Sequence, residues 1–220
     1  MEDIKNIVKS VVNAAAQITV AAVGITVTSV EKVIEIAKEI KHNTELELFV
    51  AKEGYNRFVI NKTKNTKYSI YQVFNSQEKI EYLIDGRLTP KNCAVNFVVG
   101  DQVVADVYEI RSKRRKGLIH DSVSYEFCLE VNDEHYGIIS VGFDEGKLHF
   151  ELDTNKWRAY SRVNDRKVEI YDEYEQVIAS IDMKPGVRDM ITVDVKENHN
   201  QLLALMYGFV VIAINKYARK

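Results

Sequence analysis

Between about residue 45 and residue 196, apolar and polar side chains alternate in short segments. In MITVDV at 190–195, the aliphatic positions share one face, and the polar Thr192 and Asp194 share the other. A period of two is typical of β-strands with one buried face. The pattern predicts strands at KYSIYQVF, KIEYLI, CAVNFVV, VVADVYEI, YEFCLEV, YGIISVGF, KLHFEL, RKVEIY, QVIASIDM and MITVDV.

The segments between these strands are short and rich in turn residues, as in NSQE, VGDQ, VNDEH, DEGK, YDEYE and KPGV. No strand is followed by a pattern long enough for the crossover helix that parallel strands need. We therefore expect an antiparallel sheet of about ten to twelve strands. DQVVADV and EQVIASI are similar hairpin halves, with YSIYQVFNSQEKIEYLI as a looser third copy. Hairpins repeated in this way favour a sheet that curls on itself.

The chain closes with NQLLALMYGFVVIAINKYARK, in which no residue from Leu202 to Ile214 is charged. A helix that is apolar all round must be enclosed by protein or lipid. The run is short for a bilayer, which argues against a C-terminal tail anchor. A sheet of about a dozen strands closes into a barrel too wide for its own side chains to fill, so a central helix at about 199–216 would fill it. The small residues expected to let the barrel wall approach closely are Ala204, Gly208 and Ala213.

The predicted fold is therefore mainly β (α+β): a closed antiparallel β-barrel of about twelve strands around a buried C-terminal apolar helix. We expect this barrel over 43–220 and an N-terminal helical arm over 1–42, where apolar residues recur every three or four positions. The β-branched run near Gly24 leaves open one long helix or a helical hairpin. Val11 to Val30 carries no charge and is long enough to span a bilayer, but its polar positions and few Leu or Phe favour packing on the domain or on another copy.

Composition adds little charge-based guidance. The formal net charge is −2 over 220 residues, so no overall basic field attracts nucleic acid or membrane, and any electrostatic partner must meet a local patch. Cys93 and Cys128 have no CxxC spacing, and we expect two free buried thiols in a reducing cytoplasm. The start MEDIKNIVKS lacks the features of a signal peptide, which also favours a cytoplasmic location.

Several segments follow one another in a particular order: NKWRAYS with Trp157, then KVEIYDEYEQVIASIDMK, then ITVDVKENHNQLLALMYGFVVIAI, with YEIRSKRRKGLIHDSVSYEFCLE upstream. This order resembles the tubby C-terminal-like superfamily, in its LURP-one-related branch, which also holds the phospholipid scramblases. The resemblance covers about Phe58 to Lys216, rests on degenerate hydrophobic patterns, and departs at DMKPGVRDM, where members often have an aromatic-rich segment. It implies a barrel that is not an enzyme and that binds lipid, because tubby domains bind phosphoinositides and scramblases act at membranes.

One local feature agrees with lipid binding. The stretch RSKRRKG carries five cations at a predicted strand end: Arg111, Lys113, Arg114, Arg115 and Lys116. They could hold an anionic headgroup, Arg by bidentate bonds and Lys as a point charge. The alternative is a solvated hairpin tip that keeps an edge from pairing. A separate hypothesis is a structural or regulatory protein whose arm, residues 1–42, self-associates or binds a protein partner.

The sequence contains few motifs that indicate catalysis or ligand binding. There is no HExxH, paired CxxC, GxSxG, EF-hand loop or glycine-rich phosphate loop. We expect His120, His135 and His149 to be surface or strand residues, His199 to cap the closing helix, and Trp157 to lie in the core. We therefore predict no catalytic residue, metal or cofactor. Nucleic-acid binding is not favoured, since the pI is near 6.2 and no aromatic platform accompanies the cations.

Overall fold

The computed structural model describes residues 48–62, 69–87, 92–115, 122–144, 146–162, 165–183 and 190–217. The arm predicted over 1–42, including the apolar stretch at 11–30, lies outside these residues. Within the described ranges, no helix combines the length and the apolar character needed to cross a membrane.

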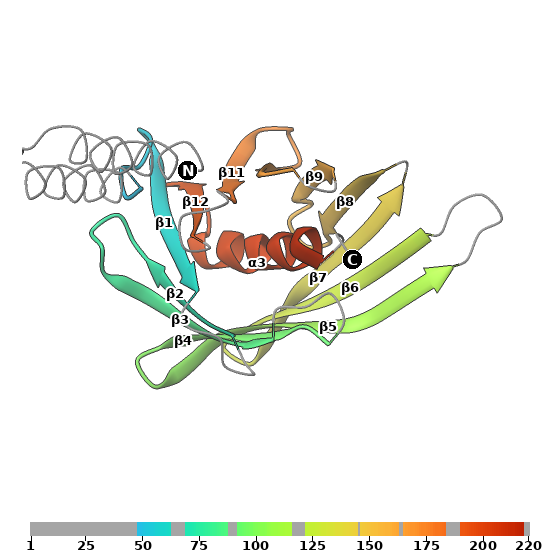
Figure 1. Ribbon diagram of the computed structural model, residues 1–220, viewed down its shortest axis with the longest axis horizontal. Coiled ribbons are helices and arrows are strands. Elements are labelled where there is room, and N and C mark those ends of the chain that lie inside the picture. Colours follow the sequence, from blue (N-terminus) through green and yellow to red (C-terminus); the bar gives the residue numbers. More distant parts are fainter. Residues whose placement is uncertain are drawn as a thin grey trace, which may run out of the picture.

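Twelve strands form one closed barrel in the order β1-β12-β11-β10-β9-β8-β7-β6-β5-β4-β3-β2, and each pair of neighbours is antiparallel (Figure 1). The strands are β1 (Tyr55–Lys62), β2 (Ser69–Phe74), β3 (Ile80–Arg87), β4 (Ala94–Val99), β5 (Gln102–Arg115), β6 (Ser122–Val131), β7 (Glu134–Asp144), β8 (Lys147–Leu152), β9 (Arg158–Arg162), β10 (Lys167–Tyr171), β11 (Val177–Asp182) and β12 (Ile191–Lys196). The predicted closed antiparallel barrel is confirmed.

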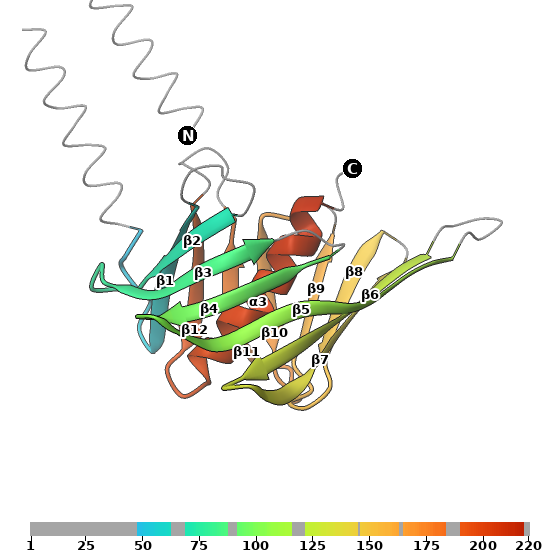
Figure 2. The same ribbon diagram turned by 90° about the horizontal axis from the view of Figure 1, so that it is seen from below.

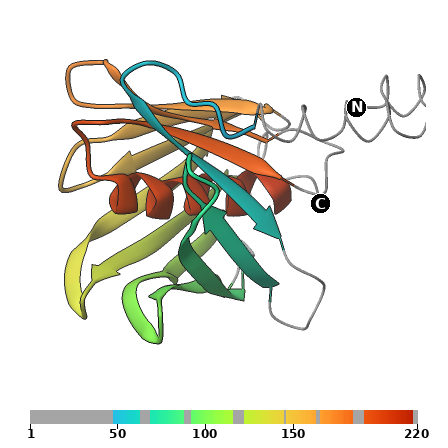
Figure 3. The same ribbon diagram turned by 90° about the vertical axis from the view of Figure 1, so that its left-hand side faces the viewer.

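The helix α3 (Gln201–Tyr217) runs through the barrel, and Figures 2 and 3 show strands around it on opposite sides. Every residue from 203 to 215 is buried, as the uncharged run predicts. The expectation that His199 caps this helix is wrong. Asn200 is the cap, because its side-chain Oδ1 accepts the backbone N–H of Leu203 at 3.0 Å, a preferred arrangement at helix starts.

One buried polar contact fixes the far end of the helix against the wall. Asn215 donates through Nδ2 to Ser161 Oγ of β9 at 3.0 Å, and both residues are almost fully buried. Paired amide and hydroxyl groups satisfy each other here, and an unpaired one would lose the hydrogen bonds that water gives it. The contact therefore favours one axial position of α3 within an otherwise apolar interior.

The predicted close approach at Gly208 is not observed. A Cβ added there would lie 3.5 Å from Ile181 Cδ1, which is ordinary van der Waals contact. By contrast, Gly86 in β3 has φ +144°, and a Cβ there would lie 2.1 Å from the carbonyl oxygen of Ala94. Gly86 is thus required by its backbone, whereas Gly208 leaves room for alanine.

Gly208→Ala is expected to raise the free energy of unfolding by about 0.5–1 kcal/mol. Alanine has a higher helix propensity than glycine, and it lowers the conformational entropy of the unfolded chain. Chemical denaturation followed by circular dichroism measures it. Gly86→Ala serves as the contrasting variant and should lower stability. A destabilising Gly208→Ala would show that the wall is tighter around α3 than the structure indicates.

Candidate functional site

The interior of the barrel is occupied by protein. The helix residues and the inward side chains of the strands form one cluster of buried apolar residues. Its polar content among the described residues is small and includes the Ser161–Asn215 pair and the hydroxyl of Tyr207, which has no hydrogen-bond partner. A ligand would have to displace α3 to enter. The candidate binding surfaces are therefore outward side chains and projecting loops.

The hairpin of β5 and β6 extends beyond the rest of the barrel (Figures 1 and 2). On one side, β5 pairs with β4 only from Gln102 to Tyr108. On the other side, its pairing with β6 continues to Arg115, which lies opposite Ser122. Glu109 still donates its backbone N–H to the carbonyl oxygen of Cys93 at 2.9 Å. From Ile110 onward, the described part of β5 pairs with β6 alone. We call residues 109–115 and 122–126 the β5–β6 ribbon.

The ribbon carries the predicted cationic residues. Arg111 is exposed and lies opposite Glu126, with 4.0 Å between Arg111 Nη1 and Glu126 Oε1. Both side chains are more than a third exposed, so this ion pair contributes little stability. The backbones of Lys113, Arg114 and Arg115 follow in the same strand, opposite 124, 123 and 122. Lys116 lies outside the described residues.

A change of register lies at the base of the ribbon. The pairing of β5 with β6 shifts between Glu109 and Arg111, and Ile110 between them is 46% exposed. Bulges of this kind bend a strand and increase its local twist. The sequence at this point therefore combines an exposed aliphatic side chain with the first cation of the run.

A second group of functional side chains gathers on the outward face of β5, β6 and β7. Cys128 Sγ lies 3.2 Å from His135 Nδ1 and 4.0 Å from Glu130 Oε1. The hydroxyl of Tyr108 donates to the same Glu130 oxygen at 2.5 Å. We call these four residues the Cys128 cluster. Hydrogen bonding to Cys128 and Glu130 raises the pKa of Tyr108, so its hydroxyl keeps its proton at neutral pH.

Two further acidic residues lie near Glu130 of the Cys128 cluster. Asp106 lies opposite Glu130 in the sheet, and its carboxyl pKa is raised by burial and then by the charges of Glu130 and Asp133. This patch of the barrel wall is therefore negative. It differs in sign from the ribbon that begins a few residues further along β5.

Sequence reasoning missed the Cys128 cluster. Cys128 and Cys93 are both buried and form no disulfide, as predicted, but only Cys93 belongs to the apolar core. The available signal was the turn VNDEH. Asn132 and Asp133 both have positive φ and form a tight hairpin turn, which places Glu130 directly opposite His135. Cys128 lies two residues before Glu130, and alternation along a strand returns it to the same face.

The other residues singled out in the sequence lie in the core or contact aromatic rings, where these residues are described. Trp157 is 5% exposed in the core, as expected. His149 is exposed and contacts the ring of Tyr160, while His199 lies beside Trp157. His120 falls outside the described residues. Across the described ranges, no group of three or more His, Cys, Asp or Glu residues is arranged to hold a metal ion.

Comparison with protein-family models, with curated proteins and with solved structures found no match to this chain. The resemblance to the tubby C-terminal-like superfamily therefore stays a prediction from sequence order. The barrel with its C-terminal helix is shown by the structure. The β5–β6 ribbon is the candidate binding surface.

Proposed function

We propose that this protein is a non-enzymatic binding module that docks on anionic membrane lipid through the β5–β6 ribbon. The observation that supports the proposal is the extension of β5 past β4, since it carries a run of cations away from the acidic barrel wall. The filled interior supports it too, because it leaves outward surfaces for recognition. The sequence resemblance implies the same class of ligand.

The expected energy of docking is modest and depends on salt. Each Lys or Arg near an anionic surface contributes about 1 kcal/mol, so five give roughly 5 kcal/mol before ordering of side chains is subtracted. The exposed Ile110 adds apolar contact at the same end of the strand. Screening shortens the reach of these charges from about 8 Å at 0.15 M salt to about 3 Å at 1 M. Binding should therefore be reversible by salt.

Co-sedimentation of the full-length chain with anionic and neutral vesicles tests the proposal. Changing Arg111, Lys113, Arg114, Arg115 and Lys116 to Ser should abolish binding to anionic vesicles, and the unaltered protein should release in high salt. The matched control changes five exposed cations elsewhere on the barrel to Ser: Lys79, Arg87, Lys147, Arg162 and Arg166. Both variants lower the net charge equally, so they differ only in whether the removed cations belong to the run at 111–116 or lie elsewhere on the barrel.

The outcomes distinguish the proposal from its alternative. Equal loss in both variants would show that overall charge, and not the ribbon, attracts the vesicles. Full binding by the ribbon variant would refute docking through 111–116. Absence of binding by the unaltered chain would favour the other hypothesis, a regulatory protein whose residues 1–42 self-associate or bind a protein partner. Light scattering of the unaltered chain then measures self-association directly.

A further inference from the structure

The Cys128 cluster brings a nucleophile and a base into contact on the outside of the barrel. Cys128 Sγ and His135 Nδ1 are 3.2 Å apart, within the range of a sulfur–nitrogen hydrogen bond. Three neighbouring strands supply the partners: Tyr108 lies opposite Cys128, and His135 lies opposite Glu130. Because the closed sheet holds these strands in register and a tight turn joins β6 to β7, the contact is built into the fold.

Cys128 lies outside the apolar core. Cys128 is 5% exposed and is not part of the core cluster, whereas Cys93 is 2% exposed and belongs to it. His135, which contacts the sulfur, is an exposed residue of the β6–β7 hairpin. Exposed side chains change rotamer within picoseconds to nanoseconds. Small reagents that reach Cys128 therefore approach it from the outer face, beside His135, and the barrel need not open.

We propose that Cys128 is a site of covalent modification by small disulfides, with His135 as its general base. A thiol reacts as the thiolate, so a base at hydrogen-bond distance accelerates reaction by accepting the proton. The tautomer of His135 that carries its proton on Nε2 has a lone pair on Nδ1 for this purpose. The proposal is independent of the lipid-docking function.

The chemical step is thiol–disulfide exchange. The Cys128 proton passes to His135 Nδ1, and the thiolate attacks one sulfur of a small disulfide RS–SR. The Cys128–S–SR bond forms as the RS–SR bond breaks. The leaving RS⁻ takes the proton from the imidazolium of His135 and departs as RSH. Cys128 sulfur is oxidised, the leaving sulfur is reduced, and the disulfide supplies the oxidising equivalent.

The charge around the cluster selects the reagent. Asp106, Glu130 and Asp133 are close enough to one another for their charges to interact. Carboxylates at this site attract a cationic disulfide and repel an anionic one. The geometry therefore points to amine-bearing disulfides as the preferred class. Glu130 is the nearest carboxylate to the sulfur, at 4.0 Å.

The test exposes the folded full-length protein to cystamine, which is cationic, and to dithiodiglycolate, which is anionic. Mass spectrometry follows the mixed disulfide, and peptide mapping assigns it to Cys128 or Cys93. Cystamine should modify Cys128 faster than dithiodiglycolate does, and Cys93 should stay unmodified. His135→Gln should slow modification of Cys128 at least about tenfold, since a general base contributes that much or more.

His149→Gln is the matched control, because His149 is exposed on β8 and contacts Tyr160. It should leave the rate unchanged. Glu130→Gln should narrow the ratio of the cystamine rate to the dithiodiglycolate rate. Equal rates for His135→Gln and His149→Gln would overturn the base assignment, and modification of Cys93 at the same rate as Cys128 would show that unfolding exposes the thiols. An anionic reagent as fast as the cationic one would overturn the charge selection.

Discussion

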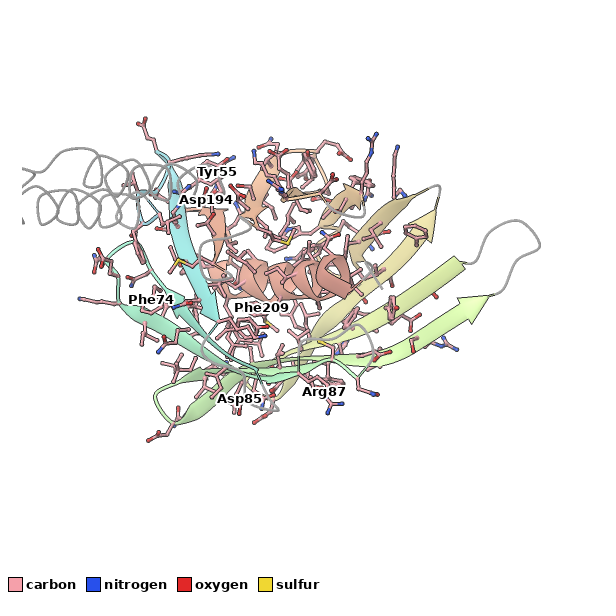
Figure 4. All side chains as sticks on the ribbon, viewed as in Figure 1. Tyr55, Phe74, Asp85, Arg87, Asp194 and Phe209 are labelled. Carbon is pink, nitrogen blue, oxygen red and sulfur yellow. The ribbon has the colours of Figure 1, made fainter. Side chains whose placement is uncertain are left out.

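Phe209→Ala is expected to lower the free energy of unfolding by about 3–5 kcal/mol, one of the largest losses of any single substitution in this barrel. Phe209 lies in the middle of α3 and is 1% exposed (Figure 4). Its ring makes edge-to-face contacts with Tyr71 of β2 at 5.6 Å and Phe97 of β4 at 5.5 Å between ring centroids. Alanine would remove both contacts and leave a cavity between the helix and the wall.

The size of this loss follows from the position of Phe209. Aromatic pairs contribute about 0.5–1.5 kcal/mol beyond the apolar area that they bury. Strands on a closed barrel are held by hydrogen bonds on both sides, so the wall cannot easily move inward to fill the space. Phe209→Leu should therefore lose less than Phe209→Ala, because leucine fills more of the volume.

Equilibrium denaturation in urea measures the effect, with Tyr174→Ala as the control. Tyr174 is 74% exposed in the turn between β10 and β11, and its replacement should change stability by less than about 0.5 kcal/mol. A loss below about 1 kcal/mol for Phe209→Ala would mean that α3 does not support the wall at this level.

The sequence predicted the barrel well where strands alternate between an apolar inner face and a polar outer face. All ten predicted strands correspond to observed ones, and KLHFEL matches β8 residue for residue. The two unpredicted strands lack that pattern for physical reasons. In β9, the inward positions are Ala159 and Ser161. A polar serine is accommodated there because it forms a hydrogen bond with Asn215. In β1, Val59 is buried although it lies between the inward Phe58 and Ile60.

The repeated hairpins also proved more regular than their sequences. The looser copy, at β2–β3, shares its turn with the copy at β10–β11. Asn75 and Asp172 each accept two backbone N–H groups from the turn, and Glu78 and Glu175 each have φ of 60°. The carboxamide of Asn75 and the carboxylate of Asp172 thus stabilise their turns in the same way.

The Cys128 cluster, in contrast, depends on cross-strand register. Tyr108 of β5 lies opposite Cys128 of β6, and the register shift near Glu130 sets the position of Glu130 against β7. Neither can be derived from periodicity, because periodicity fixes the face of a residue and not its neighbour on the next strand. The projection of the β5–β6 ribbon depends in the same way on where β4 ends.

Asp194→Ala is expected to lower the free energy of unfolding by about 3–5 kcal/mol, because it removes one partner of a buried ion pair. Asp194 of β12 lies opposite Arg57 of β1, at the point where the last strand meets the first and the barrel closes. Arg57 Nε donates to Asp194 Oδ1 at 2.6 Å, and Nη2 donates to Oδ2 at 2.8 Å. The side chains are only 17% and 7% exposed.

This bidentate pair holds Arg57 strongly in its charged form. Its hydrogen bond to Asp194 raises the pKa of Arg57, against the opposing effect of burial, and the charges of Asp194 and Asp182 raise it further. Without Asp194, the guanidinium would remain charged at every accessible pH and would lack its main acceptor. The loss in Asp194→Ala is thus mainly the penalty of an unpaired charge at the seam.

A double substitution that removes both charges separates that penalty from the value of the pair. Arg57→Met together with Asp194→Leu should be markedly more stable than Asp194→Ala alone, since neither charge remains. The surface pair of Lys167 and Glu169, 3.1 Å apart with side chains 55% and 36% exposed, provides the control. Glu169→Ala should lose less than about 1 kcal/mol, because solvent replaces the missing partner. If Asp194→Ala lost no more than this control, water would reach the seam, and closure of the barrel would rest on backbone pairing between β1 and β12.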